Sequence, residues 1–177
     1  MRKIAFISIL SIFLTFFLLW VSQYTFPYKG FFPYKGVALQ YSKSFLSKAA
    51  NFDGVHYLSI AEKGYSQYEQ AFFPLYPLLI RLFGKLFFGN LLLAGIFLSK
   101  LCFVLGTVLL YKVFKKEFGE KVAFWSVIFL IFFPTSFYFN VVYTESLFLF
   151  LFALGLYFLQ KKKGFFAFLS FYFFRFF

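Results

Sequence analysis

Long apolar runs dominate the chain, and short basic links separate them. The runs lie at residues 4–21, 91–114, 122–139, 146–160 and 165–177. A helix needs roughly 20 apolar residues to cross the hydrocarbon core of a bilayer. The first four runs predict membrane-spanning helices, and the last predicts an incomplete fifth span. The expected fold class is therefore all-α: a polytopic transmembrane helical bundle.

The region 22–90 is richer in polar and aromatic residues and predicts a long first loop with interfacial helices. Within it, residues 71–88 read AFFPLYPLLIRLFGKLFF. Drawn as a helix, this segment has most of its large apolar side chains on one face, with Pro77, Arg81 and Lys85 opposite. That pattern favours a helix lying in the membrane surface. A crossing helix is the alternative, and it would place the basic link after residue 114 outside.

Composition supports the membrane class. The 177 residues are 62% hydrophobic with a mean hydropathy of +0.81, more apolar surface than a soluble domain of this length could cover. The net charge of +12 would suggest nucleic acid in a soluble protein. Here the basic residues cluster at the ends of apolar runs, as in membrane proteins, so we expect a membrane partner and no nucleic acid. The single Cys102 cannot form an intramolecular disulfide.

The basic residues also predict an orientation. Arg2 and Lys3 precede the first run, and no small-residue cleavage site follows it, so an uncleaved signal anchor with a cytoplasmic N-terminus is expected. Lysines gather again in the links at 112–121 and 161–163. Placing all three groups inside satisfies the positive-inside rule. The first loop and the turn at 140–146 then share the outer side.

The rarest polar side chains gather in the segment NFDGVHYLSIAEKGY, residues 51–65. It holds the only aspartate, Asp53, and the only histidine, His56. On a helix, His56 and Tyr57 share a face with Asp53. An aspartate beside a histidine at a membrane surface is a plausible general base.

A purely structural interpretation of the same segment is also open. Asn51 or Asp53 could cap a helix that Gly64 ends. A divalent metal is possible, since Glu62 and Glu69 lie nearby, but too few ligands are present to predict a metal site.

A second acidic candidate, Glu145, stands in VVYTES at the mouth of a predicted span. Thr144 could cap that helix, and the helix dipole would favour Glu145 in its first turn. The functional alternative places Tyr143 and Glu145 opposite Asp53 across an outer cavity. Pro134 would kink the preceding span.

Three basic residues could meet lipid. Arg81 and Lys85 lie one helical turn apart and could hold a lipid phosphate or make ordinary headgroup contacts. Lys100 lies within an apolar run, where an ionisable group is costly, and it could serve function or extend to the interface.

Three blocks, NFDGVHYLSIAEKGY, AFFPLYPLLIRLF and FFPTSFYFNVVYTESLF, resemble the PIG-V family of mannosyltransferases, the GPI mannosyltransferase 2 type and its prokaryotic relatives. The family's first motif usually reads Trp-Asp-Gly, and Phe52 stands here in the tryptophan position. The resemblance implies a GT-C glycosyltransferase with a polyprenyl- or dolichyl-phosphate sugar donor. It also implies that Asp53 is catalytic. Family members have more spans, so the chain is expected to be an N-terminal fragment.

The resulting hypothesis is transfer of a sugar, mannose by analogy, from a lipid phosphate to an acceptor hydroxyl on a glycan or lipid at the outer face, with inversion. Asp53 would be the base and His56 would orient it or the acceptor. Sugar hydroxyls would bind Tyr57, Tyr65, Tyr143 and Glu145, and the departing phosphate would bind Arg81 or Lys85. No nucleotide site is needed, because the donor arrives in the membrane; no cofactor is certain, and a divalent metal is possible.

Two non-enzymatic alternatives remain: a lipid-linked sugar flippase or transporter, and an assembly subunit. The expected location is the plasma membrane of a prokaryote, or the endoplasmic reticulum membrane in a eukaryote.

Overall fold

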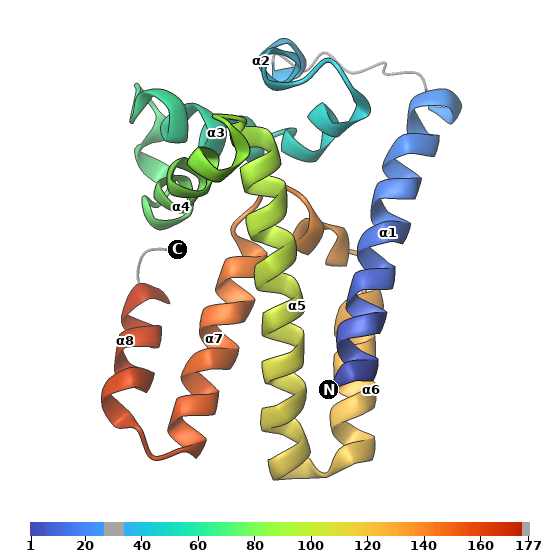
Figure 1. The fold of residues 1–177 in the computed structure, drawn as a ribbon, viewed down its shortest axis with the longest axis vertical. Helices are drawn as coiled ribbons and strands as arrows, with labels where there is room; N and C mark the ends of the chain where they lie inside the picture. Colours follow the sequence, from blue (N-terminus) through green and yellow to red (C-terminus); the bar gives the residue numbers. More distant parts are fainter. Residues whose placement is uncertain (27–33, 175–177) are drawn as a thin grey trace.

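The computed structural model describes residues 1–26 and 34–174, and over these residues every regular element is helical (Figure 1). The α-helices are α1 (Arg2–Thr25), α2 (Tyr34–Tyr41), α3 (Asp53–Lys63), α4 (Leu75–Gly84), α5 (Leu91–Phe118), α6 (Glu120–Phe132), α7 (Glu145–Gln160) and α8 (Gly164–Phe174). Four short 3-10 helices join them: η1 (Phe45–Ala50), η2 (Glu69–Ala71), η3 (Lys85–Phe87) and η4 (Ser136–Asn140). The all-helical prediction is confirmed for the described residues.

The helices form two layers. The longer helices α1, α5, α6 and α7, with α8, make a bundle, and the short helices α2, α3 and α4 cover one end of it (Figure 1). Within the described residues, α1 and α5 are long and apolar enough to cross a membrane. Helix α7 is apolar but has 16 residues, fewer than a span usually needs.

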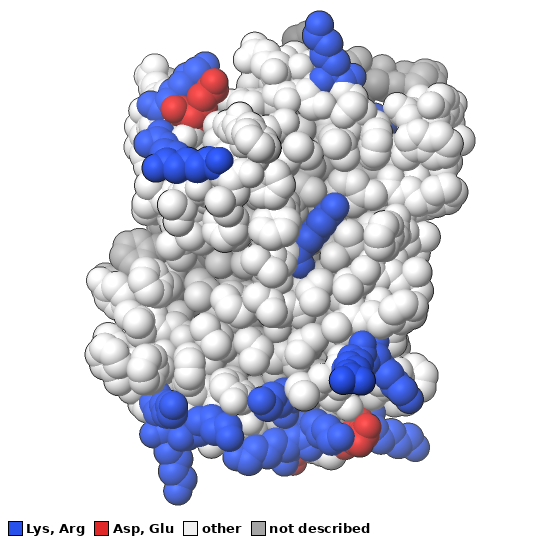
Figure 2. All heavy atoms as spheres, viewed as in Figure 1, with Lys and Arg blue, Asp and Glu red and all other residues white. Residues whose placement is uncertain are grey.

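Most of the basic side chains gather at one end of the molecule. The N-terminus and the α5–α6 and α7–α8 connections lie at the end away from the short helices (Figure 1). Lysine and arginine crowd that end, while the flank of the bundle is almost uncharged (Figure 2). The structure therefore places the three basic groups at one end, as the proposed orientation requires.

The predicted span at 122–139 is two elements rather than one. Helix α6 ends at Phe132, and Phe133 has an extended backbone with φ −62° and ψ 142°. Pro134 explains the break, because a proline disfavours helical backbone in the residue before it. The chain then turns into η4, so the proline ends the helix instead of kinking it.

Helix α5 is the central element and contacts α1, α4, α6 and α7. Its approach to α7 is close at Gly106, where an added Cβ would lie 3.1 Å from the backbone nitrogen of Phe150 and 3.2 Å from its Cα. Small residues allow such approaches between apolar helices. A hydrogen bond of 2.9 Å between the hydroxyls of Ser8 and Thr107 ties α1 to α5.

Replacing Gly106 with valine should separate α5 from α7, because the obstructing atoms belong to backbone and cannot move aside. We expect a loss of about 1–3 kcal/mol in the free energy of unfolding, measured as a lower thermal midpoint in detergent. The matched control is Gly164→Val, where a Cβ meets nothing within 4 Å. Equal midpoints for the two variants would contradict this account of the interface.

Candidate active site

The site forms where the loop before α3 meets the segment before α7. The backbone N–H of Val142 donates to the carbonyl of Ala49 at 2.8 Å. Gly54 allows the close fit, because a Cβ there would lie 3.0 Å from the carbonyl oxygen of Val142. The Tyr143 hydroxyl donates to the carbonyl of Asn51 at 3.1 Å. These contacts join segments about 90 residues apart.

Asp53, Tyr143 and Glu145 share one electrostatic environment at this junction. Burial raises the pKa of Tyr143, and the charge of Asp53 raises it further. Burial also raises the pKa of Glu145, which stands at the outer end of α7, and Asp53 adds to that rise although the Glu145 backbone N–H opposes it. The structure therefore brings these three predicted site residues together.

Tyr57 lies in the same place. Burial raises its pKa, and Asp53 and Glu145 act in the same direction, whereas a hydrogen bond with Thr144 lowers it. Its ring packs edge-on against Phe72 and Tyr76. Thr144 occupies the N-cap position of α7 and Glu145 lies in its first turn, as one interpretation predicted, but the Thr144 side chain makes no cap hydrogen bond to the helix.

The junction contains unsatisfied polar atoms. Within the described residues, three buried side-chain atoms have no hydrogen-bond partner: Asn140 Oδ1, Glu145 Oε2 and Ser146 Oγ. Asn140 precedes α7, and Glu145 and Ser146 are its first two residues. Buried polar atoms are normally paired, so the unpaired oxygen of Glu145, which interacts with Asp53, is suited to receiving a hydroxyl group from a ligand.

The backbone next to Asp53 is strained. Phe52 has φ 55° and ψ −123°, a conformation that side-chain-bearing residues rarely adopt. It holds the N-cap position of α3 without a side-chain cap bond, and Asp53 is the first helical residue. Neither Asn51 nor Asp53 is the cap, so that structural interpretation of Asp53 is wrong. Gly64, with φ 86°, does end the helix as predicted. Strain of this kind tends to persist at functional sites.

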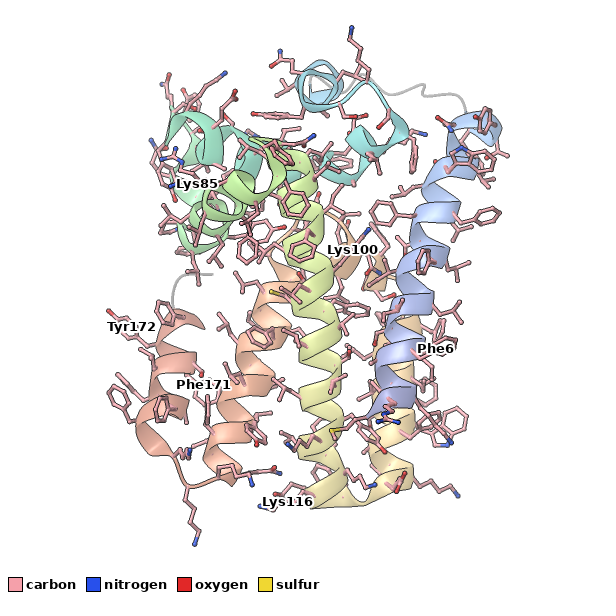
Figure 3. All side chains as sticks on the ribbon, in the orientation of Figure 1. Phe6, Lys85, Lys100, Lys116, Phe171 and Tyr172 are labelled. Carbon is pink, nitrogen blue, oxygen red and sulfur yellow. The ribbon has the colours of Figure 1, made fainter. Side chains whose placement is uncertain are left out.

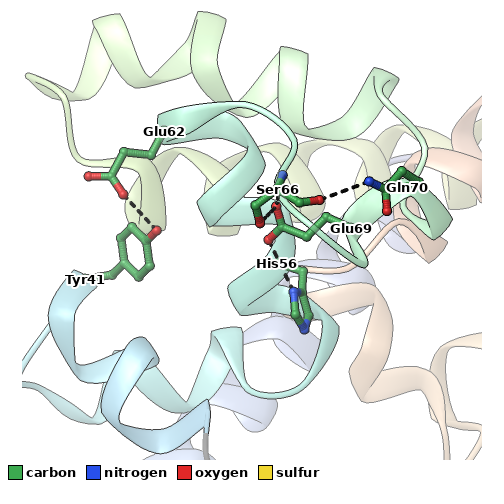
Figure 4. A network of polar contacts seen from close by, with 6 residues as sticks. All are labelled: Tyr41, His56, Glu62, Ser66, Glu69 and Gln70. Carbon is green, nitrogen blue, oxygen red and sulfur yellow. Dashed lines mark hydrogen bonds and ion pairs between the residues drawn. The ribbon is translucent and has the colours of Figure 1, made fainter.

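His56 pairs with Glu69, which the sequence suggested only as a possible metal ligand. Its Nδ1 lies 3.3 Å from Oε1 of Glu69 (Figure 4). Its ring stacks on Phe72 with centroids 4.8 Å apart. The other Glu69 oxygen accepts from the hydroxyl and backbone N–H of Ser66 at 2.6 and 2.9 Å. Glu69 is only 4% exposed. The capping-box pattern Ser-x-x-Glu at 66–69 predicts the contact between Ser66 and Glu69, and it is the sequence signal that could have drawn attention to Glu69.

Tyr65 and Arg81 bind main chain. The Tyr65 hydroxyl donates to the carbonyl of Phe72 at 2.6 Å. The Arg81 guanidinium donates to the carbonyls of Ala61 and Ile60, the latter at 3.3 Å, and so stabilises the C-terminal end of α3. Since Asp53 begins that helix, Arg81 lies about 12 Å further along it at ~1.5 Å per residue. The structure does not bring Arg81 to Asp53.

Lys85 and Lys100 lie in different layers (Figure 3). Lys85 is exposed in η3, at the edge of the short-helix layer. Lys100 lies in the bundle on α5, with its Nζ 3.7 Å from the centroid of the Phe16 ring on α1. A cation over a ring face is attracted to it, so Lys100 has a partner within the fold.

No group of three or more histidine, cysteine, aspartate or glutamate side chains that could hold a metal occurs in the part of the chain that the structure describes. We therefore assign no metal ligands.

Comparison with known protein families identifies the class of this chain. The model of the dolichyl-phosphate-mannose-protein mannosyltransferase family matches residues 70–169, more than half of the chain. The chain belongs to this family. No curated protein and no solved structure matches it.

Membership of this mannosyltransferase family makes the chain a glycosyltransferase of the GT-C type and, with two helices that could span a bilayer, indicates an integral membrane protein. The match includes α4 to α7 and therefore Tyr143 and Glu145. Asp53 and His56 lie before it. The loop before them contacts the matched region through the hydrogen bond between Ala49 and Val142.

Replacing Glu69 with glutamine should destabilise the fold. Burial alone would favour the neutral acid, but hydrogen bonds from Ser66, His56 and Ser59 outweigh it and lower the pKa of Glu69. Its stabilisation is therefore present above the ordinary glutamate pKa of about 4.3 and is lost as the pH falls through the lowered value. We expect the variant to lose about 1–3 kcal/mol at pH 7 and almost nothing near pH 3.

Thermal unfolding in detergent across that pH range measures the effect of Glu69→Gln. Exposed Glu62, which accepts a hydrogen bond from Tyr41, provides the control Glu62→Gln. A loss at pH 7 that persists unchanged at pH 3 would show that ionisation of Glu69 is not the cause.

Replacing Glu145 with glutamine should have the opposite effect on stability. An acid whose pKa is raised by folding costs stability once the pH rises through its ordinary value, because the unfolded chain ionises more readily. We expect Glu145→Gln to unfold at a higher temperature than the native chain at pH 7.5, with the difference vanishing below about pH 4. Exposed Glu117 supplies the control, Glu117→Gln, and a lower midpoint for Glu145→Gln at pH 7.5 would contradict the assignment.

Proposed function

We propose that the chain transfers a sugar, mannose by family analogy, from a dolichyl- or polyprenyl-phosphate donor to an acceptor hydroxyl at the outer or lumenal face of the membrane, with inversion. The observation that carries this proposal is the junction of the loop before α3 with the segment before α7, where hydrogen bonds from Val142 to Ala49 and from Tyr143 to Asn51 bring Asp53 next to part of the family-matched region. The resemblance to PIG-V mannosyltransferases supports the same reaction and adds a GPI-type glycan or a lipid as the acceptor class.

In the proposed reaction Asp53 is the general base. Its carboxylate takes the proton of the acceptor hydroxyl as that oxygen attacks the anomeric carbon. The bond between the anomeric carbon and the phosphate oxygen breaks, and the lipid phosphate leaves with the electron pair. Attack from the face opposite the leaving group inverts the anomeric configuration. Asp53 is exposed, which gives an acceptor access to it.

The residues around Asp53 would bind the sugars. Tyr57, Tyr143 and Glu145 surround it, and the unpartnered Oε2 of Glu145 suits a sugar hydroxyl. Tyr65, whose hydroxyl donates to the carbonyl of Phe72, would contact the acceptor. His56, which stacks on Phe72 and pairs with Glu69, would be a positioning residue for α3 and the acceptor.

The basic residues of the surface layer would contact lipid headgroups. Lys85 is exposed and suited to that contact. Arg81 is exposed too, but it uses two of its donors on the end of α3. We propose headgroup binding for both, and a structural role for Arg81 in addition.

Asp53→Asn should abolish most transfer, because an amide cannot accept the acceptor proton. We expect a fall of about 10²–10⁴-fold in turnover, measured in membranes that contain the chain and labelled dolichyl-phosphate mannose. Glu62→Gln in the same short-helix layer is the control and should keep native turnover. Undiminished transfer by Asp53→Asn would remove Asp53 from the mechanism. Equal transfer with and without the protein would favour a transporter or assembly subunit.

A further inference from the structure

Two cavities have walls on α1, and the second also reaches Asn51. The first has a volume of about 470 Å³, lies between α1 and the end of α6, and is lined mainly by apolar side chains. The second has a volume of about 230 Å³ and lies in the short-helix layer around η1. Ser22 lines the first cavity and Lys48 lines the second, and Lys48 Nζ donates to Ser22 Oγ at 3.2 Å.

The first cavity is suited to an apolar chain. Its walls include large side chains that remain 44–60% exposed: Leu14, Leu18, Phe132, Phe133 and Phe137. Their position beside a helix long enough to span a bilayer means that lipid would cover them. The volume falls within the range of about 300–1,000 Å³ that ligand pockets usually have. Because α6 ends at Phe132, the chain leaves space for this cavity between α1 and η4.

The second cavity carries positive charge without matching negative charge. Lys43 and Lys48 both line it, and no carboxylate lies within ion-pair distance of either in the described residues. Lys48 is only partly exposed, and within the described residues its ammonium group donates to the neutral hydroxyl of Ser22. A partly buried ammonium group that lacks a counter-ion is costly, and a phosphate would supply the missing charge.

The second cavity also lies next to the catalytic junction. Asn51 lines it, and the carbonyl of Asn51 accepts the hydrogen bond from Tyr143. Asp53 follows two residues later. An anion held by Lys48 would therefore lie beside the general base, whereas Arg81 binds the opposite end of α3.

We propose that the two cavities form one channel for a polyprenyl-phosphate lipid: the isoprenoid chain lies in the cavity along α1, and Lys48 and Lys43 bind the phosphate. This inference deepens the proposed function and rests on it for the identity of the lipid. It assigns the donor phosphate to the η1 region instead of to Arg81 and Lys85.

The test uses the purified full chain in nanodiscs and two probes, a polyprenyl phosphate and the matching polyprenol, each with a photoactivatable diazirine in its chain. We expect the phosphate probe to label peptides from 11–22 and 131–137. Lys48→Gln should weaken its binding by about tenfold or more, with little effect on the polyprenol. Lys48→Arg should restore binding, and Lys63→Gln, at an exposed lysine of α3, should bind as the native chain does.

Labelling outside both peptides, or native affinity in Lys48→Gln, would overturn the channel. A fold defect would weaken both probes and would not be rescued by arginine, so the pair of lysine variants separates misfolding from loss of the phosphate contact. Asp53→Asn should bind the phosphate probe normally. Predicted labelling without any sugar transfer by the native chain would refute the proposed function and leave the channel, whereas transfer with labelling elsewhere would refute the channel alone.

Discussion

The hydrogen bond from Val142 to the carbonyl of Ala49 is the contact on which the rest of the site depends. Val142 is fully buried and fits between two glycines, Gly54 on α3 and Gly95 on α5, where added Cβ atoms would come within about 3 Å of it. This arrangement requires α6 to end early, because the chain must turn through η4 to reach it. Pro134 ends α6, and the turn that follows it allows the segment before α7 to pack against the loop before Asp53.

The same junction combines tight packing with unfavourable polar chemistry. On one side of it lies the strained Phe52, and on the other lies the half-buried Glu145, which interacts with Asp53 and has an unpaired oxygen. Proteins retain such features where a ligand or a reaction uses them. The nearby network of His56, Glu69 and Ser66 is by contrast well satisfied and holds α3 firmly against η2 (Figure 4).

The distribution of charge indicates how the site lies relative to the membrane. Basic residues crowd the end of the bundle away from the junction, and the described flank between the ends carries little charge apart from Lys100 (Figures 2 and 3). A donor anchored in the bilayer would reach the junction from the apolar side, whereas an acceptor would reach exposed Asp53 from water. The fold thus offers separate approaches for a lipid substrate and a polar one.

Local pattern was enough to predict the helical class, the shared end of the basic links, the end of α3 at Gly64, and the polar segment around Asp53, because each depends on neighbours within a few residues. The motifs also indicated a mannosyltransferase. Only the tertiary structure decided that Glu69 pairs with His56, that Arg81 binds the end of α3, and that α6 stops before Pro134. Only it brought Asp53 to Glu145, since that meeting depends on how η4 and α3 pack against α5, and helical periodicity carries no information about contacts 90 residues apart.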